Sequence, residues 1–419
     1  MIISQIETIR VAQFPDLIFV QVHTDTGLTG LGETWYAAAT VESAIHDHFG
    51  PLLVGRDPFE IEKHWQTMFR LSDHAGYGGA ELRAISAIDV ALWDIKGQSL
   101  NMPIFEIIGG GTRNRIKVYN TLGVYGEIDE AHKVWSDPVG VAKSLLDQGI
   151  TGMKMSPTDF IARESDGQLL FQDDLDWALR PIREIRENLG MEIDIANDAH
   201  GKWNLPNAMR IVREMESMRL MWHEELISPL NEEAHRRLQA VTSTPIAAAE
   251  RLMTRYQHRR FIESSSARIS MPDLTWTGGI SEVKKIAVLA SAHQKPIAPH
   301  DCVGPVNMMA CAHIAMATPN VMIMEYNRAM HLGWYRDFIE PDFVIDGGFL
   351  MAPTEPGLGT RLRPSVKDRP DATVRVSSGK SESWLTSVDR YTYPPKELQS
   401  EFVHSTERRR TGFNASYYD

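Results

Sequence analysis

Six ionisable residues recur through the chain at a nearly constant spacing of 23 to 27 positions. Each ends a short apolar stretch, and the six are Asp198, Glu224, Glu250, Asp273, His300 and Glu325. A single charged residue after an apolar stretch is most often a solvated loop residue. Six in one period predict instead that these side chains meet at one end of a repeating structure, where they could do chemistry together.

The first three members of this series, Asp198, Glu224 and Glu250, are all carboxylates. Oxygen donors on adjacent elements suit Mg²⁺, which prefers octahedral oxygen coordination and keeps positions for water or substrate. Zinc is less expected because no His or Cys shares their positions in the pattern. We predict a Mg²⁺ site that could also receive an anionic substrate, and the alternative is a solvated acidic rim.

Asp273 and His300 end successive apolar stretches, and we predict that they form a dyad. A carboxylate beside an imidazole fixes its tautomer and stabilises the imidazolium, as a general base requires. His200 follows Asp198 by two residues, so both side chains share a face if the strand continues. His200 could then act as a general acid, or lie in a loop if the strand has ended. Lys154 could bind a carboxylate or a sugar hydroxyl, or be solvated.

The apolar stretches belong to a pattern of short strands and amphipathic helices that begins near residue 116. We predict eight strands, over residues 117–122, 152–156, 192–198, 220–224, 245–250, 268–273, 296–300 and 321–325. One helix is clearly marked, because Asp137 can cap it, Pro138 opens it and Gly149 follows its end. Eight βα units predict a (β/α)₈ TIM barrel, whose active site lies at the C-terminal ends of the strands.

Residues 1–115 have a different pattern, typical of an α+β unit. Strands over 18–23 and 28–33 flank a turn and form a hairpin, and helical spacing follows at 60–69 and 80–98. The run Gly109-Gly110-Gly111 lies at the predicted linker to the barrel.

Composition narrows the partners and the compartment. The formal charge of −12 over 419 residues disfavours nucleic acid and anionic membranes, because both reward a basic surface. The two cysteines, Cys302 and Cys311, cannot form a disulfide framework. The N-terminal stretch lacks the pattern of a secretory signal, and no apolar run is long enough to span a membrane. We expect a cytoplasmic protein.

Several stretches resemble the enolase superfamily, within its mandelate racemase group, and most closely the acid-sugar dehydratases. The matching stretches are residues 30–35, 86–97, 197–201, 223–225, 249–252, 271–279, 299–300 with 304–305, and 356–359. Their order and spacing are highly specific. The resemblance implies a modified (β/α)₈ barrel over 116–335, an N-terminal α+β capping domain over 1–115, and a C-terminal return to the cap plus a tail over 336–419.

The resemblance also implies roles for single residues. Mg²⁺ would be held by the three carboxylates, chelate the substrate carboxylate and stabilise an enediolate. His300 would remove the proton α to the carboxylate, and His200 would protonate the departing 3-hydroxyl. Glu325 would bind substrate or stabilise the intermediate, and Lys154 and Trp35 would contact the substrate.

We therefore predict a Mg²⁺-dependent dehydratase that converts an aldonate, such as galactonate or gluconate, into a 2-keto-3-deoxy acid. Related racemases often carry Lys-x-Lys where this chain has Lys154-Met155-Ser156, which weakens but keeps open the alternative of a 2-hydroxy-acid racemase or epimerase. A third reading is a non-catalytic sugar-acid-binding barrel. The expected partner is a small acid sugar, and the expected assembly is a homo-oligomer, either a dimer or an octamer.

Overall fold

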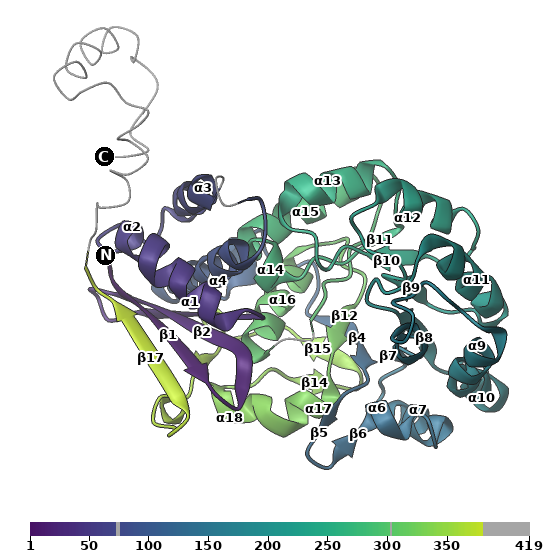
Figure 1. The fold of residues 1–419 in the computed structure, drawn as a ribbon. Helices are drawn as coiled ribbons and strands as arrows, with labels where there is room; N and C mark the ends of the chain where they lie inside the picture. Colours follow the sequence, from purple (N-terminus) through teal and green to yellow (C-terminus); the bar gives the residue numbers. More distant parts are fainter. Residues whose placement is uncertain (73–75, 302–303, 380–419) are drawn as a thin grey trace, which may run out of the picture.

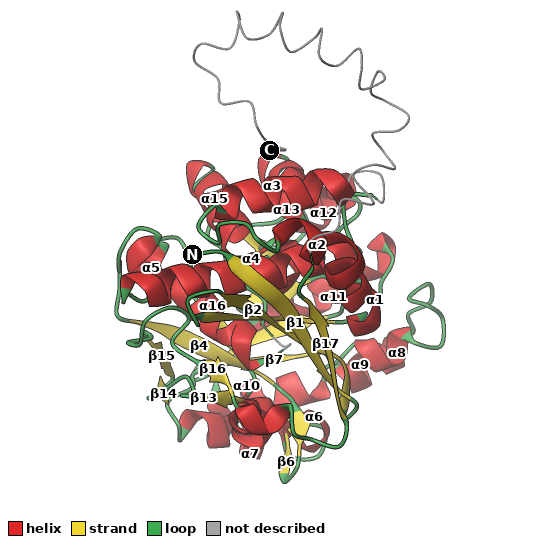
Figure 2. Cartoon of the chain, turned by 90° about the vertical axis from the view of Figure 1, so that its left-hand side faces the viewer, coloured by secondary structure: helices red, strands yellow, loops and turns green. Residues whose placement is uncertain are grey.

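The computed structural model describes residues 1–72, 76–301 and 304–379. The N-terminal strands β1 (Ile3–Val11), β2 (Phe14–Thr24) and β3 (Thr29–Trp35) form an antiparallel sheet. The predicted hairpin is confirmed, since Val22 on β2 pairs with Gly30 on β3. The last described strand, β17 (Ala372–Ser377), pairs with β1, so the chain returns to its first sheet after the barrel (Figures 1 and 2).

Helices α1 (Ala38–Ser43), a π-helix (Ala44–Phe49), α2 (Gly50–Leu53) and α4 (Ala80–Leu100) pack against this first sheet, and α3 (Ile61–Ser72) packs against α4. The long helix α4 is buried over most of its length. Two glycines allow β3 to lie against it, because a Cβ at Gly30 or Gly32 would come within 1.9 Å of a backbone oxygen of α4. The hairpin and the helix therefore form one compact unit.

Parallel strands form the barrel (Figure 1); they are β4 (Arg115–Thr121), β7 (Gly152–Met155), β8 (Asp194–Asp198), β9 (Trp222–Glu224), β10 (Ile246–Ala248), β11 (Ile269–Ser270) and β12 (Met324–Tyr326). Each pairs with the next from β4 to β11, and β12 pairs with β4. The predicted strand 296–300 makes isolated parallel bridges only, in which Ile297 joins Ser270 to Val321. Because proline has no backbone N–H, Pro296 and Pro299 limit the ladder there. These bridges close the ring at the position between β11 and β12.

Longer helices cover the outside of the barrel; they are α7 (Pro138–Leu146), α9 (Gln172–Ala178), α10 (Arg180–Leu189), α11 (Leu205–Met215), α12 (Glu232–Gln239), α13 (Thr254–Glu263), α15 (Gly279–Ala292) and α16 (Pro305–Ala317). The predicted start of α7 is confirmed, since the Asp137 side chain accepts a hydrogen bond from Gly140 N. Among the described residues, no helix is long and apolar enough to cross a membrane.

Short elements complete the fold. The short helices are α5 (Ile104–Ile107), α6 (Glu130–Lys133), α8 (Asp159–Ala162), α14 (Leu274–Thr277), α17 (Arg328–Met330), α18 (Arg336–Phe338), a π-helix (His331–Tyr335) and 3₁₀ turns at Glu216–Met218 and Pro364–Val366. The short strands are β5 (Val124–Tyr125), β6 (Ile128–Asp129), β13 (Ile339–Glu340), β14 (Ile345–Asp346), β15 (Phe349–Met351) and β16 (Arg361–Leu362). The last barrel strand is thus followed by short pieces rather than by one long helix.

A compact apolar cluster of buried side chains comes from around the ring; it contains Tyr119, Ala196, Trp222, Ala247, Ile269, Met271, Ala298 and Ile323. Side chains alternate between the two faces of a strand, so residues two positions further along point the same way. This rule places five of the six ionisable strand ends directly above the cluster, which is the floor of the candidate site. The exception is Glu250, which follows Ala247 by three positions and lies beyond the end of β10.

The domain boundaries at 115 and 335 stay predictions. Residues 380–419, the end of the predicted C-terminal tail, and Cys302 lie outside the described residues.

Candidate active site

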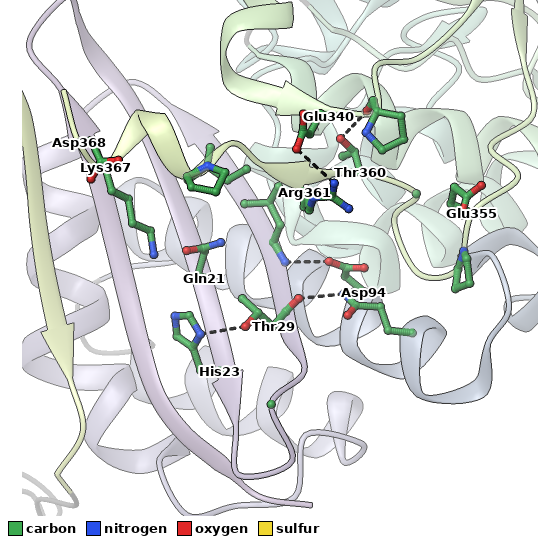
Figure 3. Close-up of a pocket in the computed structure, with 18 residues that line it drawn as sticks. Gln21, His23, Thr29, Asp94, Glu340, Glu355, Thr360, Arg361, Lys367 and Asp368 are labelled. Carbon is green, nitrogen blue, oxygen red and sulfur yellow. Dashed lines mark hydrogen bonds and ion pairs between the residues drawn. The ribbon is translucent and has the colours of Figure 1, made fainter.

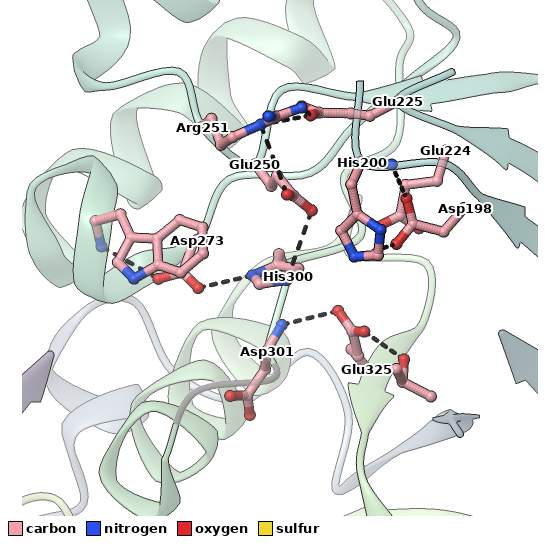
Figure 4. A network of polar contacts seen from close by, with 12 residues as sticks. Asp198, His200, Glu224, Glu225, Glu250, Arg251, Asp273, His300, Asp301 and Glu325 are labelled. Carbon is pink, nitrogen blue, oxygen red and sulfur yellow. Dashed lines mark hydrogen bonds and ion pairs between the residues drawn. The ribbon is translucent and has the colours of Figure 1, made fainter. Parts of the chain in front are cut away.

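The structure brings the six periodic residues together at one mouth of the barrel (Figure 4). Asp198 and Glu224 end β8 and β9 and are direct partners in the parallel ladder. Glu250 follows β10 by two residues, and Asp273 is bridged to His300 beyond β11. All six side chains are less than a tenth exposed, counting Glu325 on β12. The mouth therefore holds a concentration of buried charge.

Lys154, on β7, lies within this group. Its Nζ is 2.6 Å from Glu224 Oε1, 2.8 Å from Glu325 Oε1 and 3.7 Å from Asp198 Oδ2. Burial alone would lower the pKa of Lys154, but the carboxylates of Glu224 and Glu325 raise it well above its usual range. The ammonium is therefore charged, and it offsets part of the negative charge of the site.

The carboxylates at positions 198, 224 and 250 have the oxygen donors of a metal site. Across the described residues, no three His, Cys, Asp or Glu side chains already surround one point as ligands would. The reason is local: Glu224 is bonded to Lys154, and Glu250 lies 3.6 Å from His300 Nε2. Burial and the neighbouring carboxylates nevertheless raise the pKa of Glu224 above its usual range, even beside Lys154. A carboxylate cluster with this excess of negative charge suits a hard divalent cation in donor type and in charge.

His300 and Asp273 form the predicted contact. His300 Nδ1 lies 2.8 Å from Asp273 Oδ2, while Asp273 Oδ1 accepts from the backbone N–H groups of Thr275 and Trp276. These bonds to the start of α14 hold the carboxylate in place. Burial would lower the pKa of His300, but Glu250, Glu325 and the bond to Asp273 raise it well above its usual range.

His200 reaches the site by a turn, not by continuation of the strand. Strand β8 ends at Asp198, and His200 adopts a left-handed conformation with φ of 46°. Its Nε2 lies 3.3 Å from Asp198 Oδ2, and its Nδ1 lies 2.8 Å from Asp159 Oδ2. Burial lowers its pKa, but Asp198 and Asp159 outweigh burial and raise the pKa of His200 to about 9. At neutral pH this imidazole carries a proton that it could donate.

Glu325 is held from three sides. It accepts a hydrogen bond from the Thr121 hydroxyl and one from Asp301 N at 2.9 Å, in addition to its ion pair with Lys154. Burial raises its pKa, but Lys154 and His300 outweigh burial and lower the pKa of Glu325 below its usual range. Glu325 therefore stays ionised.

Trp35 is not joined to the other predicted site residues by any ring contact or hydrogen bond of its side chain within the described structure. Its indole packs against Phe14 and Trp334, with ring centroids 6.4 and 6.2 Å apart. Its carbonyl oxygen accepts a hydrogen bond from Arg83 Nη1. The backbone of Trp35 is thus linked to Arg83, and the substrate contact of Trp35 stays a prediction.

The sequence analysis missed two residues beside the base. The Trp276 ring lies 5.0 Å from the His300 ring, and the Arg83 guanidinium lies 4.3 Å above the Trp276 ring. Trp276 Nε1 is buried and has no hydrogen-bond partner in the described structure. Both residues lie in or beside stretches that carry the family resemblance, but neither has the periodic spacing that marked the strand ends. Asp159, which holds His200, was missed for the same reason.

A fourth missed residue is Glu33, on β3 of the N-terminal hairpin. Glu33 Oε1 accepts from Asn307 N at the start of α16, close after His300. Burial raises the pKa of Glu33 to about 8, although the bonds to the backbone of α16 lower it. The N-terminal unit therefore touches the segment that carries the predicted base.

Comparisons with known proteins agree with this architecture. Residues 139–366 match the family model described as Enolase C-terminal domain-like, and residues 6–109 match the Mandelate racemase / muconate lactonizing enzyme, N-terminal domain. The chain belongs to the mandelate racemase group of the enolase superfamily. The predicted family and the predicted fold, an α/β barrel with an N-terminal α+β capping domain, are confirmed.

Similar enolase-superfamily proteins cover almost the whole chain. D-galactonate dehydratase of Variovorax paradoxus (strain S110) is 35% identical over 86% of this chain and 92% of its own length. D-galactonate dehydratase of Ralstonia pickettii (strain 12J) is 32% identical over 93% and 97%. An enolase of the mandelate racemase subgroup from Agrobacterium tumefaciens, crystallised with sodium and phosphate, has a TM-score of 0.84 at 37% identity, covering 90% of this chain and 99% of its own.

Proposed function

We propose that this protein is a Mg²⁺-dependent acid-sugar dehydratase, a hydro-lyase that converts an aldonate such as galactonate or gluconate into a 2-keto-3-deoxy acid. One observation carries the proposal. The His300–Asp273 dyad stands next to the carboxylate cluster, with His300 Nε2 3.6 Å from Glu250, while His200 contacts the same cluster at Asp198. A substrate bound at the cluster would have a base and an acid within reach.

Asp198, Glu224 and Glu250 would hold the cation. When bound, Mg²⁺ supplies Lewis-acid stabilisation of the negative charge that develops on the substrate carboxylate as its α-proton leaves. The α-proton of a carboxylate is very weakly acidic, so this stabilisation and a positioned base are both needed. The cation would also offset the carboxylates that raise the pKa of His300, because a bound ion changes the local electrostatics.

His300 is the group that takes the α-proton in this proposal. A carboxylate only accepts hydrogen bonds, so the 2.8 Å contact with Asp273 assigns the Nδ1 hydrogen to His300. The lone pair of Nε2 is then free to receive the proton. Asp273 stabilises the resulting imidazolium.

His200 protonates the leaving group. The electron pair left by the α-proton forms the double bond between C2 and C3 as the C3–O bond breaks, and the departing hydroxide takes the proton of His200 to leave as water. The remaining enol becomes the 2-keto-3-deoxy acid by tautomerisation. Asp159, which is not among the proposed cation ligands, also raises the pKa of His200, so it favours the protonated donor when a cation offsets Asp198.

A library of aldonates and aldarates tests the proposal, with semicarbazide detection of 2-keto acids in the presence of Mg²⁺. We expect product from at least one acid sugar, loss of activity with chelator, recovery with Mg²⁺, and no activity in His300→Asn. The matched control is His313→Asn, a buried histidine that contacts Phe105 and Leu358 outside the site. Failure across the whole library with folded protein would sink the proposal.

Racemisation or epimerisation is the second candidate activity, and it needs a base on each face of the carbon. Lys154 is the basic residue of the Lys-Met-Ser stretch, and its ammonium is bonded to Glu224 and paired with Glu325, which keeps it protonated. Incubation in D₂O separates the two activities, since an epimerase yields the deuterated epimer without keto acid. A non-catalytic acid-sugar-binding barrel would bind the acid and give neither product.

We also propose that the protein works in the cytoplasm as a homo-oligomer, either a dimer or an octamer. Sedimentation velocity of the purified protein tests the assembly, and a monomer at micromolar concentration would contradict it.

A further inference from the structure

A cavity away from the barrel mouth lies where the first sheet meets the returning C-terminal segment (Figure 3). It has a volume of about 970 Å³ and is lined by β2, β3, α4 and the segment 340–368. Sites for small molecules typically measure about 300 to 1,000 Å³. Its described lining includes none of the residues predicted for the active site, so the two sites are separate.

The cavity lining includes a buried amide oxygen that no protein group satisfies. Gln21, on β2, is only 8% exposed, and its Oε1 has no hydrogen-bond partner in the described structure. Its neighbours are paired, since His23 Nδ1 lies 2.9 Å from Thr29 Oγ1. Leaving a buried polar group unpaired carries a desolvation cost. A ligand that bonds to this amide therefore gains from a group the fold has already buried.

A positive charge lines the same space. Lys367 Nζ bonds to Glu7, whose carboxylate also lies 3.0 Å from His23 Nε2. An ammonium has three N–H donors, and the bond to Glu7 uses one of them. In Figure 3 the Lys367 amine and the Gln21 amide point into the same space. Lys367 can thus bind an anion while it stays paired with Glu7.

Acceptors and hydroxyls complete the lining. Glu355 is exposed at the rim, and the hydroxyl of Thr29 faces His23 on the wall of the cavity (Figure 3). A ligand here meets one ammonium, one free amide, hydroxyls and carboxylates within a single cavity. This combination matches a molecule that has one carboxylate and several hydroxyl groups.

We propose that this cavity is an accessory binding site for a small polyhydroxylated carboxylate. The ligand carboxylate bonds to Lys367, one hydroxyl bonds to the Gln21 amide, and further hydroxyls donate to the acidic rim. The identification of this ligand with the acid sugars of the proposed dehydratase rests on the proposed function. The existence of the site does not depend on that function.

Calorimetric titration of the His300→Asn protein in chelator tests the site, because chelation removes the metal on which active-site binding depends. The probes are D-gluconate and D-galactonate, with galactitol as the neutral polyol and acetate as the simple carboxylate. We expect one chelator-resistant site per chain for the acid sugars. Gln21→Leu and Lys367→Met, added to this background, should each weaken binding at least about tenfold, a loss of about 1.4 kcal/mol.

Arg361→Met is the matched control, since Arg361 also lines the cavity but is 72% exposed and paired with Glu340. The dissociation constant of the acid sugar for this variant should differ from that of the His300→Asn protein by less than about a factor of two. Circular dichroism melting of each variant shows that it is folded.

Several results would overturn the proposal. They are no binding of either acid sugar in chelator, equal binding of galactitol or of acetate, or equal affinity in folded Gln21→Leu and Lys367→Met proteins. A change of oligomeric state in these variants without any ligand binding would show instead that a second copy covers the cavity. Turnover by the wild-type protein is measured separately. Chelator-resistant binding without turnover contradicts the proposed function alone. Turnover without chelator-resistant binding contradicts the accessory site alone.

Discussion

The barrel mouth and the joint around α4 both bury carboxylates, but they surround them differently. At the joint, Asp89 accepts hydrogen bonds from the backbone and hydroxyl of Ser281 at 3.0 and 2.6 Å, and Asp94 accepts from the N–H groups of Leu31 and Leu358 at 2.9 and 2.8 Å. Each of these carboxylates stands apart and holds two segments together. They are structural links between the capping domain and the rest of the chain.

At the mouth, several carboxylates gather round a single ammonium instead. Asp198, Glu224 and Glu325 all lie within 3.7 Å of Lys154 Nζ. Carboxylates gathered round one ammonium repel one another in a buried site, and their repulsion is relieved by protonation, as the raised pKa of Glu224 indicates, or by further positive charge. The number of buried carboxylates therefore does not show whether a region binds a ligand. Their crowding round one point does, and it distinguishes the mouth from the structural links at the joint.

Backbone conformation shows the same contrast. Close to the strand ends of the mouth, His200, Glu225 and Ala249 have positive φ angles of 46°, 33° and 91°. At the joint a positive φ of 82° falls on Gly279, where a Cβ would meet Asp89 at 2.3 Å, and one of 54° falls on Asn101 at the C-cap of α4, a position where asparagine commonly adopts this conformation. Non-glycine residues in this region cost free energy, and such strain concentrates at functional sites.

Asp273→Asn should have the largest effect on activity. It keeps the shape of the side chain but reverses the tautomer of the base, His300. The asparagine oxygen can still accept from Thr275 and Trp276, but its NH₂ group then faces His300 Nδ1 and forces the proton onto Nε2. We expect kcat to fall by about 10³- to 10⁴-fold, as for the same change in a serine protease triad. Steady-state kinetics with the active acid sugar measures this, and a fall of less than tenfold in folded protein would contradict the dyad.

Lys154→Met should test the crowding directly. Removing the ammonium leaves the buried carboxylates unpaired, and breaking a buried ion pair typically costs about 3–5 kcal/mol. In chelator the variant should therefore unfold at lower urea concentration than the wild type. Because a cation can replace the lost charge, Mg²⁺ should stabilise the variant more than it stabilises the wild type. An equal Mg²⁺ effect on both proteins would argue against a cation among these carboxylates.

Asp89→Ala should weaken the joint without touching the chemistry. It removes two hydrogen bonds and leaves the N–H of Ser281 buried without a partner, so we expect a loss of about 3 kcal/mol in the free energy of unfolding. Urea denaturation measures the loss, and kcat of the folded protein at low temperature should stay within about twofold of the wild type. A large fall in kcat at unchanged stability would place Asp89 with the mouth instead.

His313 should give the smallest effect, a pH dependence of stability. Its Nδ1 accepts from Phe105 N and its Nε2 donates to Leu358 O, and burial lowers its pKa from 6.5 to about 4. The unfolded chain, in which the pKa of His313 is 6.5, therefore binds the proton more tightly than the folded protein. The stability that neutral His313 gives the folded protein is fully present above about pH 6.5 and is lost as pH falls toward 4. Between about pH 6.5 and 5 we expect a loss of about 2 kcal/mol from this residue.

Urea denaturation across this pH range measures the effect against His313→Gln, whose amide can still donate to Leu358 O but does not titrate. The pH slope of the variant should be shallower by that amount. Identical slopes in the two proteins would show that His313 does not contribute.

The sequence alone predicted the barrel and the six strand-end residues, because a βα period leaves a regular trace along the chain. The N-terminal hairpin and the start of α7 were equally readable, from turn and capping residues whose effects are local. The sequence predicted a full strand over 296–300, where the structure has only isolated bridges. The two prolines there lack the N–H groups that would bond to neighbouring strands, and those neighbours are far away in sequence.

Spacing could not show which other side chains stand beside the base. Arg83 and Trp276 are 193 positions apart in the sequence. Glu33 accepts a hydrogen bond from Asn307, at the start of α16, which is 274 positions away. These contacts depend on how the capping domain docks on the barrel, which no local pattern records. Local periodicity therefore determined which residues end the strands. The tertiary structure decided that Lys154 lies among their carboxylates, that a turn carries His200 back to Asp198, and that the Trp35 ring packs away from them, because each depends on packing between distant segments.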